Sequence, residues 1–274
     1  MVKVTAQEVN ALRKKTGAGM MDCKNALVEA GGDLDAAIDI LRKKGQKVAA
    51  KRGDREAKEG FATARINESG NTGYIISVNC ETDFVAINKD FQAFAEKIMD
   101  VIVANDPKTI EAMNSLSFDD KGTIAEALTH QTGIIGEKIE IGSFERIEGK
   151  ALSIYVHPGN QVVTMVATNK ANNEVAKDVA MQAAAMAPIA LDESEVSQEV
   201  LDKELEIGKE LAIQEGKPEA LAGNIAKGRL KKFLKENTLL NQMFIKDNKK
   251  TVKQYVADAE NGLEVTGFRR VSLK

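Results

Sequence analysis

The chain contains the order strand, turn, strand, helix twice, and this repetition constrains its fold more than any other feature of the sequence. In the first copy, apolar and polar residues alternate over 61–66, turn-forming residues occupy 67–72, and a returning strand covers 74–78. This pattern predicts a β-hairpin. A helix over 90–99 follows, because its apolar residues recur at helical spacing. These residues are Phe91, Phe94, Ala95 and Ile98.

The second copy has the same order with different residues. Strands are predicted over 150–156 and 161–167, around a turn at 157–160. The predicted helix covers 175–186 and stops before Pro188. Two strand hairpins that each continue into a helix indicate an α+β fold whose core contains two related hairpin-plus-helix subdomains.

Three short helices are predicted near the start of the chain. The first begins with a capping box at 5–8 and ends at Gly17. The second stops at the glycine pair 31–32, and the third begins after the N-cap Asp33 and ends before Gly45. Helices this short make a bundle whose core is barely sufficient alone, so its outer surface is a candidate docking face.

The rest of the chain divides by composition. Residues 46–60 are charged and lose the helical apolar stripe, which is typical of a linker. A charge-rich helical hairpin is predicted over 192–236 with its turn at 215–218, and the tail over 263–271 is predicted to add a last strand to a core sheet. The predicted parts are a three-helix N-terminal domain, a linker, a core N-subdomain, a core C-subdomain and a helical hairpin inserted in the latter. Their bounds are 1–45, 46–60, 61–148, 149–191 with 237–274, and 192–236.

Composition favours a protein that works on another protein inside the cell. The 274 residues carry a formal net charge of −3, so no basic field favours wrapping nucleic acid. Cys23 and Cys80 lie outside any CxxC spacing, which excludes a disulfide framework and suits a reducing compartment. The N-terminus 1–5 lacks the apolar core of a signal peptide, and no apolar run is long enough to span a bilayer. We therefore expect a cytoplasmic protein.

The sequence contains no constellation of catalytic residues. Motifs for phosphate loops, zinc-protease helices and serine-nucleophile elbows are missing from it. The glycines at 17–19 follow a predicted helix and are interpreted as a helix–helix turn, and Asp33 with Asp35 as a helix cap rather than a calcium loop. His130, in a polar stretch after a helix, and His157, at a hairpin turn, each have a structural explanation. No cofactor, metal or enzymatic activity is expected.

Direct binding of nucleic acid is not expected either. The basic run from Arg42 to Arg52 has no interleaved aromatic residues on which bases stack, and it is interpreted as a solvated helix end. Neither the glycine turn at 17–19 nor any apolar run favours nucleotide or membrane binding. A protein is therefore the expected partner.

Two places combine large apolar side chains with turn or loop surroundings. Phe84 lies in a polar loop, 79–85, between a predicted strand and a predicted helix. Composition alone favours a Phe84 that folds back onto that helix. Met20 and Met21, in the first helix–helix turn, suit either a core or a docking surface because thioethers adapt to both. The residues by themselves leave these alternatives open.

Four stretches of the chain resemble signature sequences of the elongation factor Ts family. The first two are 16–24, TGAGMMDCK, and 78–86, VNCETDFVA. The others, 228–233 and 264–268, follow in the family's order, so the resemblance covers nearly the whole chain. It implies an N-terminal bundle similar to ubiquitin-associated domains, a core of two subdomains and an inserted helical hairpin, in agreement with the patterns above.

The resemblance also implies a function. Members of this family bind the translation GTPase elongation factor Tu and make it release GDP, so a guanine-nucleotide exchange factor is expected. By resemblance, Phe84 enters between helices of the GTPase, displaces them and disturbs its Mg²⁺ and phosphate site, with Asp83 bonding beside it. The contacts that the family implies fall on Arg13, Met20, Met21, Thr82, Asp83, Phe84, Val85, Ile135 and His157. The His157 turn is His-Pro-Gly here, a modest departure from the family pattern.

Assembly is a further expectation from the resemblance. Many family members continue beyond the strand at 264–268 into a C-terminal helical module that touches the GTPase. With the sequence ending at Lys274, we expect that contact to be missing. The helical hairpin mediates dimerisation in some relatives, but its apolar positions here are irregular. A homodimer through 192–236 stays an alternative to a monomer.

Two other function classes remain as alternatives. The N-terminal bundle alone is a candidate for recognising a ubiquitin-like surface, which a pull-down separates from GTPase binding. An enzyme requires a catalytic cluster, and a pocket containing strongly perturbed pKa values would indicate one.

Overall fold

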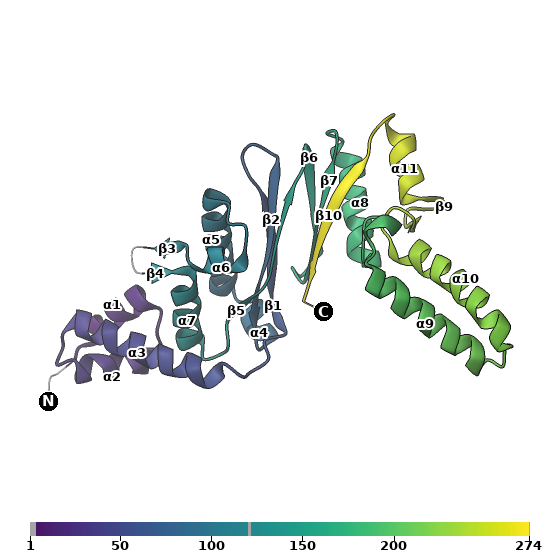
Figure 1. The fold of residues 1–274 in the computed structure, drawn as a ribbon. Coiled ribbons are helices and arrows are strands. Elements are labelled where there is room, and N and C mark those ends of the chain that lie inside the picture. The colour runs from purple at the N-terminus through teal and green to yellow at the C-terminus, as the bar shows by residue number, and fades with distance from the viewer. Residues whose placement is uncertain (1–3, 120–121, 274) are drawn as a thin grey trace. The chain divides into compact units, whose positions relative to one another are not determined.

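A computed structural model describes residues 4–119 and 122–273 (Figure 1). Residues 1–3, which belong to the segment interpreted above as lacking a signal peptide, lie outside the described residues, as does Lys274 at the end of the sequence. Helices and strands are both abundant, and the predicted α+β class is confirmed.

The chain divides into two compact units. Unit 1 comprises residues 1–63, 76–144 and 273–274, and unit 2 comprises 64–75 and 145–272. The division passes through three strands that form one sheet in the order β1-β2-β5. These strands are β1 (Glu59–Ile66), β2 (Thr72–Cys80) and β5 (Glu140–Glu148).

Unit 1 begins with the predicted three-helix bundle. Its helices are α1 (Ala6–Thr16), α2 (Met20–Glu29) and α3 (Leu34–Arg52). The capping box is confirmed: the Thr5 N–H donates to the Glu8 carboxylate at 2.7 Å, and the Glu8 N–H donates to the Thr5 hydroxyl at 3.3 Å. Gly17 ends α1 in the left-handed region at φ 72°, a conformation that glycine adopts without strain. The bundle core consists of Val9, Leu12, Ala18, Cys23, Ala26, Leu27, Ala37 and Leu41.

Two local predictions for the bundle are wrong. Helix α3 does not end before Gly45 but runs to Arg52, so the segment predicted as a charged linker starts as helix. Gly45 is buried, which gives it a packing role instead of a terminating one. Met20 and Met21 form the first turn of α2 and not the turn before it.

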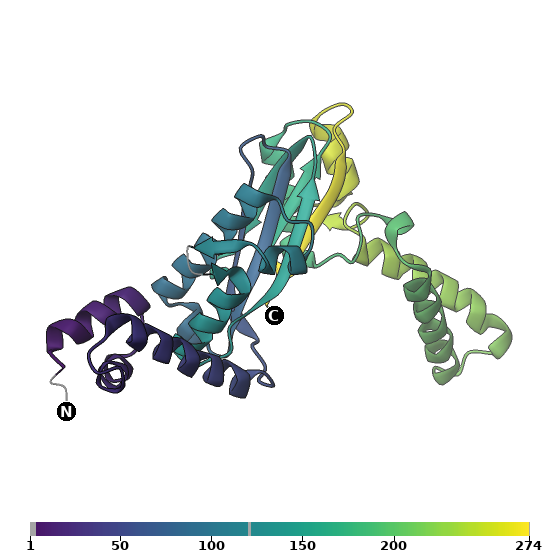
Figure 2. The same cartoon turned by 60° about the vertical axis from the view of Figure 1, so that its left-hand side comes forward.

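The remaining elements of unit 1 include one long helix that was predicted and one that was not. The predicted helix is α5, and it covers Lys89–Asn105. The helix α7 (Ile124–Ile135) was not predicted, and His130 lies within it rather than in a polar stretch after a helix. Helix α3 packs against α7; Figure 1 shows the two next to each other, and Figure 2 gives a second view of the same elements. The shorter elements are α4 (Asp83–Ala86), α6 (Ile110–Asn114), β3 (Ser117–Asp119) and β4 (Gly122–Thr123).

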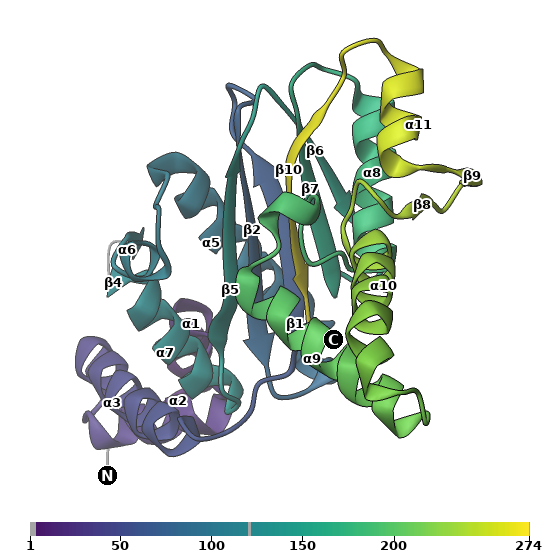
Figure 3. The same cartoon turned by 45° about the vertical axis from the view of Figure 1, so that its right-hand side comes forward.

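Unit 2 is built on a second three-stranded sheet with the order β10-β7-β6. Its strands are β6 (Ala151–Val156), β7 (Val162–Thr168) and β10 (Val265–Ser272). Both β6 and β10 pair antiparallel with β7, and the predicted tail strand is thereby confirmed. Helix α8 (Asn173–Met186) packs against this sheet, as Figure 3 shows. The smaller elements of unit 2 are β8 (Met243–Phe244), β9 (Asp247–Thr251) and α11 (Val252–Ala259).

The two sheets have the same construction. In each, the second strand of a hairpin lies in the centre, and a strand from later in the chain pairs with it. In each, a long helix follows the hairpin, α5 after β2 and α8 after β7. The shared strand order supports the repetition that the sequence indicates.

The predicted helical hairpin is confirmed in unit 2. It consists of α9 (Gln198–Gln214) and α10 (Glu219–Asn237), preceded by the short 3₁₀ helix η1 (Glu193–Glu195). Gly208 faces Ala226, where an added Cβ would lie 3.2 Å from the Ala226 Cα, so small residues allow the two helices to approach closely. Ala190, Val196 and Leu234 are buried together in a small cluster with residues of both helices. Within the described ranges, no helix is both long and apolar enough to cross a membrane.

Candidate protein-binding site

The loop after β2 presents one large aromatic side chain to solvent. The one-turn helix α4 begins three residues after β2, and Phe84, its second residue, is 78% exposed. Ile87, three residues further on, is 71% exposed. The folding of Phe84 back onto the next helix, which composition alone favours, is therefore wrong. Because phenylalanine and isoleucine are usually buried, this exposed pair marks a candidate docking surface.

Local hydrogen bonds give α4 its shape. Thr82 is the N-cap, with extended backbone, and its hydroxyl accepts a hydrogen bond from the N–H of Val85 at 3.4 Å. The N–H groups of Ala86 and Ile87 donate to the carbonyls of Thr82 and Asp83 at 3.2 and 3.0 Å. Ala86 is buried and Val85 half-buried, whereas Asp83 is exposed. The turn therefore has one face on the protein and one in solvent.

A carboxylate from a distant part of the chain closes the base of the loop. Glu137, two residues after α7, accepts hydrogen bonds from the N–H groups of Glu81 at 3.1 Å and Thr82 at 3.0 Å. It also accepts one from the Thr82 hydroxyl at 2.7 Å. The Glu81 carboxylate accepts in turn from the N–H of Lys138 at 2.7 Å and from Arg52 at 2.8 and 3.1 Å. The side chains of Glu137 and Glu81 thus connect the segment after α7 to the segment after β2, each bonding to the backbone of the other segment.

Sequence analysis missed Glu137, Glu81 and Arg52 as residues of this site. Glu81 and Glu137 are 56 positions apart, and no periodicity or spacing connects residues at such a separation. The one available signal is position, because Glu81 lies inside the 78–86 signature and Glu137 lies beside Ile135.

Cys80 lies beneath the loop as a packing residue. It is fully buried, and its thiol donates to the carbonyl of Thr82 at 3.2 Å. Burial, followed by the negative charge of Glu137, raises the pKa of the Cys80 thiol to about 12. Because the thiolate is the nucleophilic form, a thiol that stays protonated at neutral pH does not act as a nucleophile.

The N-terminal bundle carries a second exposed apolar group. Met20 and Met21 are 55% and 61% exposed, and Val28, seven residues after Met21, is 47% exposed. Residues seven apart lie on one side of a helix, so Met21 and Val28 form an apolar strip on α2. Arg13 of α1 is exposed as well.

The last two predicted residues have different surroundings. Ile135 is the final residue of α7 and is half-buried. His157 is exposed at the predicted turn between β6 and β7, and its Nδ1 lies within hydrogen-bonding distance of the Tyr155 hydroxyl, at 3.1 Å. The structure assigns every predicted site residue except His157 to unit 1, and it assigns His157 to unit 2.

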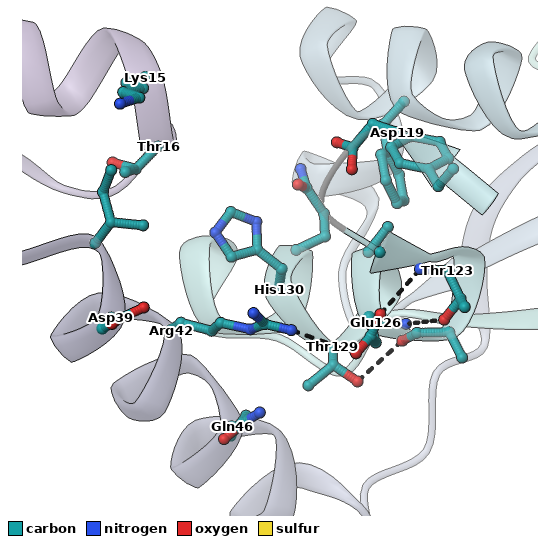
Figure 4. Close-up of a pocket in the computed structure, with 17 residues that line it drawn as sticks. Lys15, Thr16, Asp39, Arg42, Gln46, Asp119, Thr123, Glu126, Thr129 and His130 are labelled. Carbon is teal, nitrogen blue, oxygen red and sulfur yellow. Dashed lines mark hydrogen bonds and ion pairs between the residues drawn. The ribbon is translucent and has the colours of Figure 1, made fainter. Parts of the chain in front are cut away.

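Unit 1 also contains a cavity of about 580 Å³ between the bundle and α7 (Figure 4). His130 projects from α7 on this side, and Arg42 pairs with Glu126 at 3.3 Å. The Thr129 hydroxyl donates to a backbone carbonyl of α7, and Glu126 caps the same helix by accepting from the Thr123 N–H at 2.9 Å. These groups are engaged in holding helices, which gives them a structural explanation.

Metal ligands do not gather anywhere in residues 4–119 and 122–273. No group of three or more histidine, cysteine, aspartate and glutamate side chains in these ranges is arranged to hold a metal ion. The arrangement of exposed apolar side chains on rigidly bonded turns and helices suits contact with another protein.

Comparison with known proteins gives a consistent result. The family model described as Elongation factor TS matches residues 81–274. A protein named Elongation factor Ts from Christiangramia forsetii is 51% identical over 277 aligned residues, which cover 100% of both chains. Proteins of the same name from Amoebophilus asiaticus and Porphyromonas gingivalis are 50% and 45% identical, each with 98% of both chains covered.

Proposed function

The chain belongs to the elongation factor Ts family, and from this we propose that it is the guanine-nucleotide exchange factor of the GTPase elongation factor Tu in translation elongation. Its action is on a binding equilibrium and not on a covalent bond. A role in elongation implies that it acts in the cytoplasm, where ribosomes work. It needs no cofactor of its own for this action.

The observation that carries the proposal is the exposure of Phe84 on a capped helical turn. A side chain that is 78% exposed has most of its apolar surface available for burial in a partner. Burying a phenylalanine stabilises a complex by roughly 1.5 to 3 kcal/mol. Because the turn is held by hydrogen bonds before the partner arrives, little of this energy is lost in ordering it.

We propose that Phe84 enters between helices of the GTPase and shifts them, with Asp83 bonding beside it and Thr82 and Val85 completing the contact. The shift disturbs the site of Mg²⁺ and phosphate and so weakens GDP binding. By reciprocity, a factor that prefers the nucleotide-free GTPase weakens GDP binding by the same free energy.

Other contacts must contribute to a large acceleration. Each tenfold change in rate needs about 1.4 kcal/mol, so Phe84 alone supplies only about one to two powers of ten. We propose that Arg13, Met20 and Met21 on the bundle form a second contact. Ile135 and His157 are proposed as further contacts from α7 and from the β6–β7 turn.

The test is the release of a fluorescent GDP analogue from the cognate GTPase at fixed Mg²⁺, with and without this protein. Strong acceleration at substoichiometric amounts of the protein supports the proposal. Unchanged release, with both proteins shown to be folded, overturns it. A pull-down with a ubiquitin-like protein then tests the alternative that the bundle is a separate binding module.

We also propose that two copies of the chain associate through the helical hairpin. Its exposed apolar residues support this, with Ile207, Leu211 and Leu221 being 38%, 43% and 52% exposed. Sedimentation over a range of concentrations tests it: Leu211→Glu should shift the protein toward the monomer, whereas Ile245→Glu, at an exposed position outside the hairpin, should not. A wild-type protein that stays monomeric at all concentrations overturns this proposal.

A further inference from the structure

Glu137 makes an unusually complete set of bonds for a residue outside the predicted contact set. Its two carboxylate oxygens accept three hydrogen bonds, all from the two residues that join β2 to α4. Oε2 accepts from the N–H groups of Glu81 and Thr82, and Oε1 accepts from the Thr82 hydroxyl. Hydrogen bonds to an ionised acceptor are stronger than neutral ones, by about a factor of two.

The Thr82 hydroxyl connects this carboxylate to the helical turn. It donates to Glu137 and at the same time accepts from the N–H of Val85. The donated bond directs the hydroxyl lone pairs toward the turn, so Glu137 supports the N-cap of α4. The chain of bonds runs from Glu137 through Thr82 to the turn that carries Phe84.

The opposite side of the same junction is also bonded. Glu81 accepts from the N–H of Lys138, the residue after Glu137, and its side chain is only 13% exposed. Arg52, the last residue of α3, pairs with Glu81 through both carboxylate oxygens. The end of α3, the end of β2 and the segment after α7 are therefore joined at one point.

Such a junction has a clear use for a turn that exposes phenylalanine. A helix of four residues has too few internal hydrogen bonds to be stable alone, because helix nucleation is unfavourable. In water, a loop without these bonds would lower its free energy by collapsing so that Phe84 is covered. Bonds at the base of the loop oppose that collapse and keep the side chain outward.

We propose that Glu137 is a positioning residue for nucleotide exchange, which holds the Phe84 turn in its outward conformation by accepting hydrogen bonds from Glu81 and Thr82. The inference rests on the proposed exchange function. Glu137 acts through Phe84 and does not itself contact the GTPase.

A double-mutant cycle between Glu137→Ala and Phe84→Ala tests the inference in the GDP-release assay. We expect Glu137→Ala to lower the accelerated release rate by about 3- to 10-fold, the range given by the cost of ordering one side chain. In the Phe84→Ala background, the same substitution should cause a clearly smaller loss, because the largest contact that the turn makes is already absent. An equal loss in both backgrounds would overturn the inference.

The conservative variant Glu137→Gln provides a rescue measurement. Its amide has one oxygen left to accept the two backbone N–H bonds, and its NH₂ group can donate to the Thr82 hydroxyl. We expect its exchange rate to lie between those of wild type and Glu137→Ala. A Gln variant as impaired as the Ala variant, with an intact fold, contradicts the hydrogen-bonding role. If Glu137→Ala fails to fold, the cycle is carried out with Glu137→Gln and the same criterion applies.

Glu195→Ala is the matched control. The Glu195 carboxylate also accepts a bond from a backbone N–H, that of Leu191 at 3.1 Å, but it lies in unit 2. The Glu195→Ala substitution should leave the accelerated rate of GDP release unchanged. Hydrogen–deuterium exchange adds a direct readout: the amides of Glu81 and Thr82 should exchange faster in Glu137→Ala, and unchanged protection would count against the inference. If the wild-type protein fails to accelerate GDP release from the GTPase, the proposed function itself is overturned, so the two failures are distinguishable.

Discussion

At the scale of single residues, Phe84 has the largest exposed fraction among the large apolar side chains of residues 4–119 and 122–273. Phenylalanine is generally buried, yet here Phe84 is 78% exposed, and Ile87, three residues further on, is 71% exposed. The hydrogen bonds that Glu137 accepts at the base of the loop offset the unfavourable exposure of this side chain. An apolar side chain on a turn that is already held by hydrogen bonds can contact another protein with little loss of conformational entropy.

Replacement of Phe84 by alanine should impair exchange without preventing binding. We expect Phe84→Ala to lower the acceleration of GDP release by about 10- to 100-fold, since burial of the ring is worth roughly 1.5 to 3 kcal/mol. Complex formation with the nucleotide-free GTPase, measured by calorimetry, should persist through the other contacts. Ile189→Ala, which truncates a 52% exposed isoleucine elsewhere, is the control and should have no effect. Complete loss of binding by a folded Phe84→Ala protein would show that the roles are distributed differently.

Cys80 should be unreactive in the folded protein. Burial, and then the charge of Glu137, raise its pKa to about 12, and only the thiolate reacts with alkylating agents. The variant Cys23→Ser leaves Cys80 as the single thiol. Mass spectrometry should find it unlabelled by iodoacetamide at pH 8 in the native state and labelled after denaturation. Rapid labelling of the native protein would contradict the burial.

The same pKa shift makes stability depend on alkaline pH. In the unfolded chain the thiol ionises near its ordinary pKa of 9.0, and in the folded chain only near 12. Between these values the unfolded state binds fewer protons, so the contribution of Cys80 to the free energy of unfolding decreases as pH rises from 9 to 12. The free energies of unfolding of wild type and Cys80→Ala, measured by denaturant titration, should therefore converge as the pH approaches 12. A constant difference between them across this range would exclude the shift.

At the scale of elements, the contact of α3 with α7 depends on a pair of glycines. A Cβ added to Gly133 would overlap the Cα of Gly45, whereas a Cβ added to Gly45 would lie 3.5 Å from the Cα of Gly133, an ordinary contact. The two positions therefore face each other but tolerate different changes. Helix α7 leads directly to Glu137, so its position also affects the loop that carries Phe84.

Substitution by alanine should have opposite effects at these two glycines. Gly133→Ala is expected to lower the free energy of unfolding by about 1–3 kcal/mol through overpacking. Gly45→Ala should be neutral or stabilising, because alanine favours a helix over glycine by about 0.8–1.0 kcal/mol. Urea denaturation of the two variants checks this, each serving as the control for the other. Equal destabilisation by both would mean that backbone flexibility, and not the close approach, is what the glycines provide.

Elements with local signals were predicted well, and elements without them were missed. Capping residues and glycine stops correctly indicated α1 and α2, and alternation indicated both hairpins. Helix α7 was missed because the stretch around His130 is polar, although a capping box at Thr123 marks its start and Ile124 and Leu128, four residues apart, are both buried. The end of α3 was placed too early because glycine often ends a helix, whereas Gly45 is buried inside α3, where it faces Gly133.

At the scale of the whole molecule, the proposed function is a thermodynamic coupling between two ligands of the GTPase. This protein and GDP should each weaken the binding of the other by the same factor, and couplings of this kind are typically about 1–3 kcal/mol, or 5- to 150-fold. Calorimetry gives both ratios: the affinity of this protein for the GTPase with and without GDP, and the affinity of GDP with and without this protein. Phe84→Ala should reduce both ratios together. A protein that binds the two forms of the GTPase equally well would contradict the proposed coupling.

The residues of the candidate site were predicted from the resemblance to known sequences. The order of most elements, the α+β class and the repeated hairpin were predicted from patterns in the chain itself. These features depend on interactions between residues a few positions apart, such as helix caps, turn conformations and apolar spacing, and short segments carry that information. Three other features follow only from the folded chain: the exposure of Phe84, the bonds of Glu137 to Glu81 and Thr82, and the place of Gly45 inside a helix. Exposure and pairing depend on which distant segments come to lie beside a residue, and that is settled only when the whole chain packs.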